Sequence, residues 1–159
     1  GIRDTDRARG LGDVYKRQIQ SLGGTPVWPI IALSNIAQAS AVTGIIIVSR
    51  KHNEREISVP AAISAYLGVT EPAMYGINLK YRFPMLCAMI GSGLAGLVCG
   101  LNGVMANGIG VGGLPGILSI QPAYWQVFAL AMAIAIIVPM ALTTVVYQRK
   151  FRQGSLQIV

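Results

Sequence analysis

Glu71 is the residue of this sequence whose type and position are best suited to chemistry. It lies in the stretch ISVPAAISAYLGVTEPAMYGINLKYRF, residues 57–83, where most neighbours are apolar or small, and no Asp or Glu follows it up to Val159. A carboxylate in such surroundings could accept hydrogen bonds from ligand hydroxyls, bind a cation or proton, or stabilise the positive end of a helix. Which of these applies depends on the elements that position it.

The composition places those elements in a membrane. Hydrophobic residues make up 53% of the 159 residues and charged residues only 12%, whereas soluble domains carry about 25% charged residues. Residues 19–49 and 83–148 contain no charge. Each range is longer than the ~20 apolar residues that cross a bilayer as a helix. The sequence therefore predicts an all-α integral membrane protein.

The net charge of +7 comes from basic residues that form short clusters beside the apolar ranges. Such clusters are typical of loops on the cytoplasmic face. Because no aromatic residues interleave with a long basic patch, we expect no nucleic-acid partner. The sequence also lacks paired carboxylates, metal-ligand spacings and nucleophile–base pairs. We therefore predict no catalytic residue, no metal and no cofactor in this chain.

Residues 1–18, GIRDTDRARGLGDVYKRQ, differ from the rest. They are rich in charge and lack the apolar segment of a signal peptide. We interpret 1–18 as a non-native or disordered leader and 19–159 as the membrane domain. Within that domain, three ranges are predicted to span the membrane as helices: about 25–49, 83–104 and 123–147.

Residues 57–79 are also numerous enough to span a membrane, but the charges argue against it. If this range spanned, the basic residues at 50–55 and the pair Lys80 and Arg82 would face opposite sides, and one group would violate the positive-inside bias. If the range enters and leaves by one face, both groups and the cluster at 149–152 become cytoplasmic. We therefore predict a re-entrant helical hairpin and a cytoplasmic C-terminus.

Local residue types agree with a hairpin. Ser58 can cap a first helix that tolerates Pro60 in its first turn, and Gly68 can supply a left-handed stop. The residue before a proline avoids the α region. Glu71 is therefore expected to be extended, with Pro72 in the first turn of a second short helix.

Two such half-helices reach ~13 Å each, about half of the hydrocarbon core. The tip, Val69, Thr70 and Glu71, should thus lie near mid-membrane, where irregular backbone is tolerated only inside protein or beside a cavity. Ionisable residues at that depth usually mark a substrate or ion path. Ligand binding is accordingly favoured over a helix cap as the role of Glu71, although the two are compatible.

A glycine-rich connection, MANGIGVGGLPGILSIQP at 105–122, joins the last two spans. It is not a dinucleotide loop, since no strand–turn–helix unit surrounds it and no acidic residue follows. In the preceding span, Ser92, Gly96 and Gly100 form a stripe of small residues that would let helices pack closely. The connection itself could belong to a mobile gate or to a second broken element.

The run Gly68–Val69–Thr70–Glu71–Pro72 resembles the G-[IV]-T-E-P motif of the membrane-embedded IIC component of the sugar phosphotransferase system, glucose superfamily. The similarity extends over residues 19–159, including IQSLGGTPVWPIIALSNIAQ, RKHNEREISVPAAISAYLGVTEPAMYGINLKYRFPM and NGIGVGGLPGILSIQP. These longer segments resemble the C-terminal part of trehalose-specific members. The implied fold is about three transmembrane helices plus one re-entrant hairpin, a fragment of a larger IIC domain.

The resemblance also implies a function. A IIC homodimer in the bacterial inner membrane takes up a sugar, here trehalose, and presents it to a phosphocysteine of a IIB domain that is charged by a IIA protein. Glu71 would accept hydrogen bonds from sugar hydroxyls, and Gly68, Val69 and Thr70 would help to hold the ring. Tyr66, Tyr75 and Tyr81 flank the hairpin and could stack on a sugar or sit at the membrane interface.

Two parts of the family pattern are missing from the chain. The phosphorylated cysteine belongs to IIB, and neither Cys87 nor Cys99 has its context; the intramembrane histidine motif is absent as well. This chain alone is therefore expected to be inactive. The alternatives are an ion-coupled secondary transporter or channel with Glu71 as its ion or proton site, and a structural membrane subunit without a ligand. A IIB domain encoded upstream would favour the first interpretation.

Overall fold

The computed structural model describes residues 13, 17, 21, 23–49, 52–108, 110 and 112–152. Most of the expected leader, 1–18, lies outside the described residues. The described part is helical. Its β-structure is limited to two isolated bridges in the segments outside the helices. Its elements follow in the order α2 Val27–Val48, α3 His52–Tyr66, α4 Glu71–Ala73, the π-helix η1 Met74–Asn78, α5 Leu79–Tyr81, α6 Phe83–Leu101, the 3-10 helices η2 Leu114–Ser119 and η3 Pro122–Tyr124, and α7 Trp125–Arg152.

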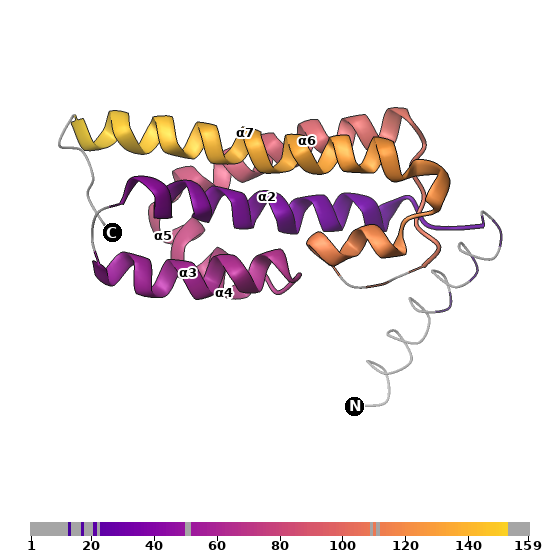
Figure 1. The fold of residues 1–159 in the computed structure, drawn as a ribbon, viewed down its shortest axis with the longest axis horizontal. Coiled ribbons are helices and arrows are strands. Elements are labelled where there is room, and N and C mark those ends of the chain that lie inside the picture. Colours follow the sequence, from indigo (N-terminus) through magenta and orange to yellow (C-terminus); the bar gives the residue numbers. More distant parts are fainter. Residues whose placement is uncertain are drawn as a thin grey trace.

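Among the described residues, three helices are long and apolar enough to cross a membrane, as the charge-free ranges predict. They are α2, α6 and the stretch Pro122–Lys150, which holds most of α7. Figure 1 shows them side by side along the long axis of the molecule. Two boundaries differ from the expected ones: α6 ends at Leu101, and α7 continues through the basic cluster to Arg152.

Small residues set the spacing between these helices. Gly91 of α6 lies directly against the ring of Pro139 in α7, and Gly44 of α2 faces the backbone of Met140. Buried alanines and a few large side chains, Leu33, Ile36 and Phe128 among them, fill the space between the helices. In the predicted stripe, a Cβ on Gly96 would lie 3.8 Å from Cγ2 of Ile30 in α2, whereas nothing described lies within 4 Å of a Cβ on Gly100.

The chain between α2 and α6 forms the predicted hairpin. After α2 ends, α3 runs back alongside it, and the chain then reverses so that α4, η1 and α5 return beside α3 (Figure 1). Ala61, Ala62 and Ala65 of α3 pack with Ala73 and Ile77 of the returning arm in a second buried cluster. The hairpin therefore enters and leaves at the same end of the helix bundle.

Two local predictions within the hairpin are wrong. Ser58 does not cap α3, because the helix begins at His52; the preceding charged segment consists largely of good helix formers, and Pro60 consequently lies inside the helix. Glu71 is not extended but is the first residue of α4, with Pro72 in the first turn as expected. A hydrogen bond of 2.8 Å from the Met74 N–H to the Thr70 carbonyl holds this turn and outweighs the bias before proline.

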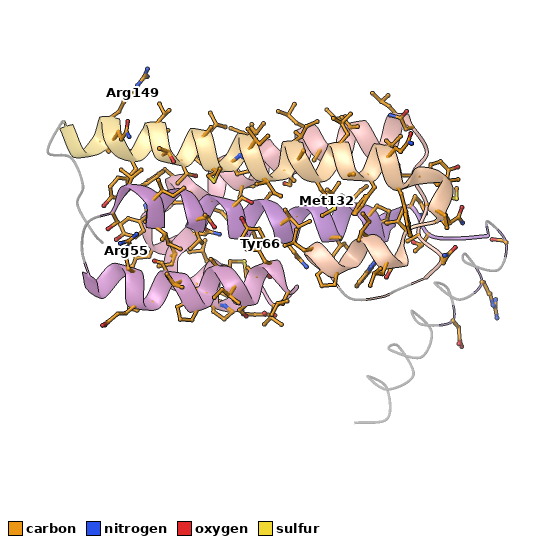
Figure 2. All side chains as sticks on the ribbon, in the orientation of Figure 1. Arg55, Tyr66, Met132 and Arg149 are labelled. Atoms are coloured by element: carbon orange, nitrogen blue, oxygen red, sulfur yellow. The ribbon has the colours of Figure 1, made fainter. Side chains whose placement is uncertain are left out.

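Basic side chains gather at one end of the bundle. Figure 2 shows Arg55 and Arg149 at the end where α2 finishes, although they belong to helices distant in sequence. Lys150 places its Nζ 5.2 Å from the ring centroid of Phe83, so the end of α7 lies against the start of α6. Arg55, Arg149 and Lys150 thus share one end of the bundle, which is the arrangement expected from the positive-inside bias.

The opposite end is closed by backbone pairing. Thr25 and Ala106 exchange hydrogen bonds of 2.9 and 3.0 Å between their N–H and C=O groups, and Ala106 also bridges to Ile120. All three residues are buried. This pairing fixes both ends of the glycine-rich connection to the start of α2.

Candidate ligand-binding site

The tip of the hairpin is a tight turn built by its own backbone. Gly68 has φ +103°, a value that glycine adopts readily and that ends α3 as predicted. The N–H of Gly68 donates to Ala65 O at 3.0 Å and that of Val69 to Ser64 O at 2.9 Å. Ser64 Oγ donates in turn to Val69 O at 3.0 Å. These bonds stabilise the turn that carries the chain into Glu71.

The four predicted site residues, Gly68, Val69, Thr70 and Glu71, lie together in this turn and at the start of α4. Glu71 is exposed, and its carboxylate has no hydrogen-bond or ion-pair partner among the described residues. Val69 is 53% exposed, and the half-buried Thr70 makes no capping bond with its side chain. The carboxylate is therefore available to an external donor, such as a ligand hydroxyl.

Asn35 is a contact of this turn that the sequence did not single out for a role. Its Nδ2 donates to Gly68 O at 3.4 Å, from a position roughly 12 Å along a helix of about 33 Å. The tip of the hairpin is thus level with the middle third of α2. A polar residue in a charge-free span was the available signal, but its partner lies 33 residues away in the sequence.

Tyr66, one of the three flanking tyrosines, anchors the hairpin to α2. The Tyr66 hydroxyl lies 3.0 Å from Ser40 Oγ and 3.4 Å from Thr43 Oγ1. Figure 2 labels Tyr66. Tyr81 packs edge-on against Phe83 with centroids 6.2 Å apart, whereas Tyr75 is 66% exposed. Of the three, Tyr75 is the one whose ring is open to a ligand or to lipid.

No protein-family profile and no solved structure matches the chain. Among curated proteins, a trehalose-specific EIIBC component of the PTS system from Escherichia coli K12 is 86% identical over 159 residues, which is 100% of this chain and 33% of that protein. The chain belongs to the EIIBC components of the PTS system. Its apolar helices agree with the membrane location of this family.

More distant members show how far the similarity extends. A trehalose-specific EIIBC component of Bacillus subtilis is 52% identical over 120 residues, covering 76% of this chain and 26% of that protein. A sucrose-specific EIIBC component of Pasteurella multocida is 43% identical over 132 residues, covering 83% of this chain and 28% of that protein. The chain thus spans about a third of the length of its Escherichia coli relative. It spans a smaller share of the other two relatives.

Proposed function

We propose that this chain is the sugar-holding part of a PTS permease and that Glu71 accepts hydrogen bonds from the hydroxyls of the sugar. The observation that carries the proposal is the exposed, unpartnered carboxylate at the break of the hairpin, among the residues the structure describes. An ionised carboxylate in such a place is costly unless a partner is supplied. A polyhydroxylated ligand supplies several donors at once.

Trehalose is the proposed sugar, because relatives with 86% and 52% identity bear that specificity in their names. The sucrose-specific relative at 43% identity makes a disaccharide the broader class. In the complete protein, a homodimer in the bacterial inner membrane would take up the sugar. A IIB domain, charged by a IIA protein, would phosphorylate it on the cytoplasmic side.

Gly68, Val69 and Thr70 are proposed to hold the sugar ring through the backbone of the turn. The carbonyl groups of Gly68 and Val69 already accept bonds from Asn35 and Ser64, so each has one further lone pair for a hydroxyl. No residue of the chain is proposed to act as nucleophile or base. Phosphate transfer would occur on IIB, and this chain would bind and move the sugar.

The test replaces Glu71 in a full-length EIIBC protein that carries this sequence. A charge-assisted hydrogen bond contributes about 1.5–3 kcal/mol. A loss of ~2 kcal/mol corresponds to about 30-fold weaker binding, so we expect Glu71→Ala to weaken trehalose binding by at least that factor in calorimetry. Glu71→Gln keeps one acceptor oxygen and should fall between Ala and the parent.

Glu56 provides the matched control, because it is a second exposed carboxylate on the same hairpin but near its base. Glu56→Ala should leave the affinity for trehalose within about twofold. Phosphorylation of IIB should be unchanged in every variant, since that chemistry lies outside this chain. A folded, dimeric Glu71→Ala protein that binds trehalose like the parent would remove Glu71 from the site.

A further inference from the structure

The tip of the hairpin meets the glycine-rich connection backbone to backbone. A Cβ built on Gly68 would lie 2.9 Å from the carbonyl carbon of Gly112 and 3.0 Å from its oxygen. A Cβ on Gly113 would overlap the carbonyl oxygen of Tyr66, and Gly113 has φ +68°. These distances are too short for a side chain at Gly68 or Gly113, so the contact depends on glycine at both positions.

Asn35 completes this contact from α2. Its Nδ2 donates to Gly68 O, and a Cβ on Gly112 would lie 2.6 Å from the same nitrogen. The amide therefore occupies the space beside Gly112 and reaches the turn only because Gly112 has no side chain. Three segments that are remote in sequence converge on Gly68, three residues before Glu71.

We propose that Asn35 and Gly112 are positioning residues, which fix the turn at Gly68 so that the Glu71 carboxylate is presented to the sugar. The proposal rests on the function proposed above for Glu71. Because the turn approaches from the basic end and the glycine-rich connection from the opposite end, the site forms where the two elements meet (Figure 1). The connection is then the second broken element of the site.

The experiment is a double-mutant cycle in the full-length protein. Asn35→Ala removes one hydrogen bond of ordinary strength, and we expect trehalose affinity to fall about fivefold. Gly112→Ala should cause a similar loss, because its methyl group displaces the Asn35 amide. In the double variant the methyl group meets no amide, so the loss should remain about fivefold, whereas independent effects would multiply to roughly 25-fold. Gly108→Ala is the control, since nothing lies within 4 Å of a Cβ there.

Hydrogen exchange supplies a readout that does not depend on the sugar. The amides of Gly68 and Val69 are bonded within the turn, and both should exchange about fivefold faster in Asn35→Ala and in Gly112→Ala, with no change in Gly108→Ala. A residue that only stabilised the fold would instead lower the unfolding midpoint and leave the affinity of the folded protein unchanged. That result, or multiplicative losses in the cycle, would overturn the proposal.

A background of Glu71→Ala separates this proposal from the function on which it rests. If the two positioning residues act through Glu71, Asn35→Ala should cause no further loss of affinity in that background. A further fivefold loss would show that Asn35 affects sugar binding by a route other than the Glu71 carboxylate, and would refute the proposal that it positions that carboxylate. If Glu71→Ala itself bound trehalose normally, the proposed function would fail, while coupled exchange rates would still establish the contact between Asn35 and Gly112.

Discussion

Gly91 of α6 lies against the ring of Pro139 in α7, and its replacement by alanine tests the packing of these spans. A Cβ there would overlap Cγ and Cδ of Pro139 and lie 3.3 Å from its backbone nitrogen. The proline ring cannot rotate away, so the helices would have to separate. Overpacking of this kind costs about 1–3 kcal/mol, and the rigid neighbour places the cost near the upper end.

The helix propensity of alanine offsets part of this steric cost. Replacing glycine by alanine inside a helix stabilises it by roughly 0.5–1 kcal/mol. For Gly91→Ala the steric cost exceeds this gain, and we expect a net destabilisation of about 2 kcal/mol. Gly93, two residues further along α6, has nothing within 4 Å of a Cβ. Gly93→Ala should therefore be more stable than the parent by roughly 0.5–1 kcal/mol, with no steric cost.

The measurement is the free energy of unfolding of the full-length protein by reversible detergent titration. Gly91→Ala and Gly93→Ala should differ by close to 3 kcal/mol, with opposite signs relative to the parent. In a Pro139→Ala background the ring is absent, and Gly91→Ala should cost less than about 1 kcal/mol. A Gly91→Ala protein as stable as the parent would refute the packing described between α6 and α7.

Two further substitutions test the hairpin by the same titration. Arg82 joins α5 to α6 with φ +60°, a strained value for any residue but glycine. Arg82→Gly should therefore be about 1 kcal/mol more stable than Arg82→Ala, because both lose the charge but only alanine keeps the strain. Equal stabilities of the two variants would contradict this backbone conformation. Tyr66→Phe removes the hydroxyl bonded to Ser40 and should cost about 1 kcal/mol. The exposed Tyr75→Phe should cost nothing measurable, and equal costs for the two tyrosines would remove Tyr66 as an anchor.

The spans and the hairpin could be predicted because both leave a signal in the charges. Apolar ranges without Asp, Glu, Lys or Arg have few alternatives to a membrane helix. The direction of the hairpin follows from the basic residues beside it, since Lys80 and Arg82 can join the other clusters only if the chain returns. The bundle indeed gathers Arg55 and Arg149 at one end.

Helix boundaries within the hairpin were harder to predict, because hydrophobic periodicity does not mark them. The charged residues that begin α3 at His52 are helix formers without an apolar stripe, so the first predicted helix began too late. The π-helix Met74–Asn78 in the returning arm has no simple sequence signal either. It lets Ile77 and the fully buried Asn78 face the interior of the protein.

The surroundings of the candidate site depend on packing that no local pattern encodes. The motif around Glu71 predicted the turn, since Gly68 ends the first helix and Pro72 lies in the first turn of the second. The approach of Gly112 to Gly68 joins residues in different elements, and glycine at either position is compatible with many loops. Only the fold shows that Asn35 lies beside both glycines.

The role proposed for Glu71 requires that the hairpin return to the membrane face from which it enters. Single cysteines at His52, where α3 begins, and at Gln148, near the end of α7, test this directly in the full-length protein with its other cysteines replaced. Both should react with an impermeant maleimide only from the cytoplasmic side, and a cysteine at the exposed Asn107 only from outside. Labelling of His52 and Gln148 from opposite sides would mean that 57–79 crosses the membrane and would contradict the re-entrant hairpin.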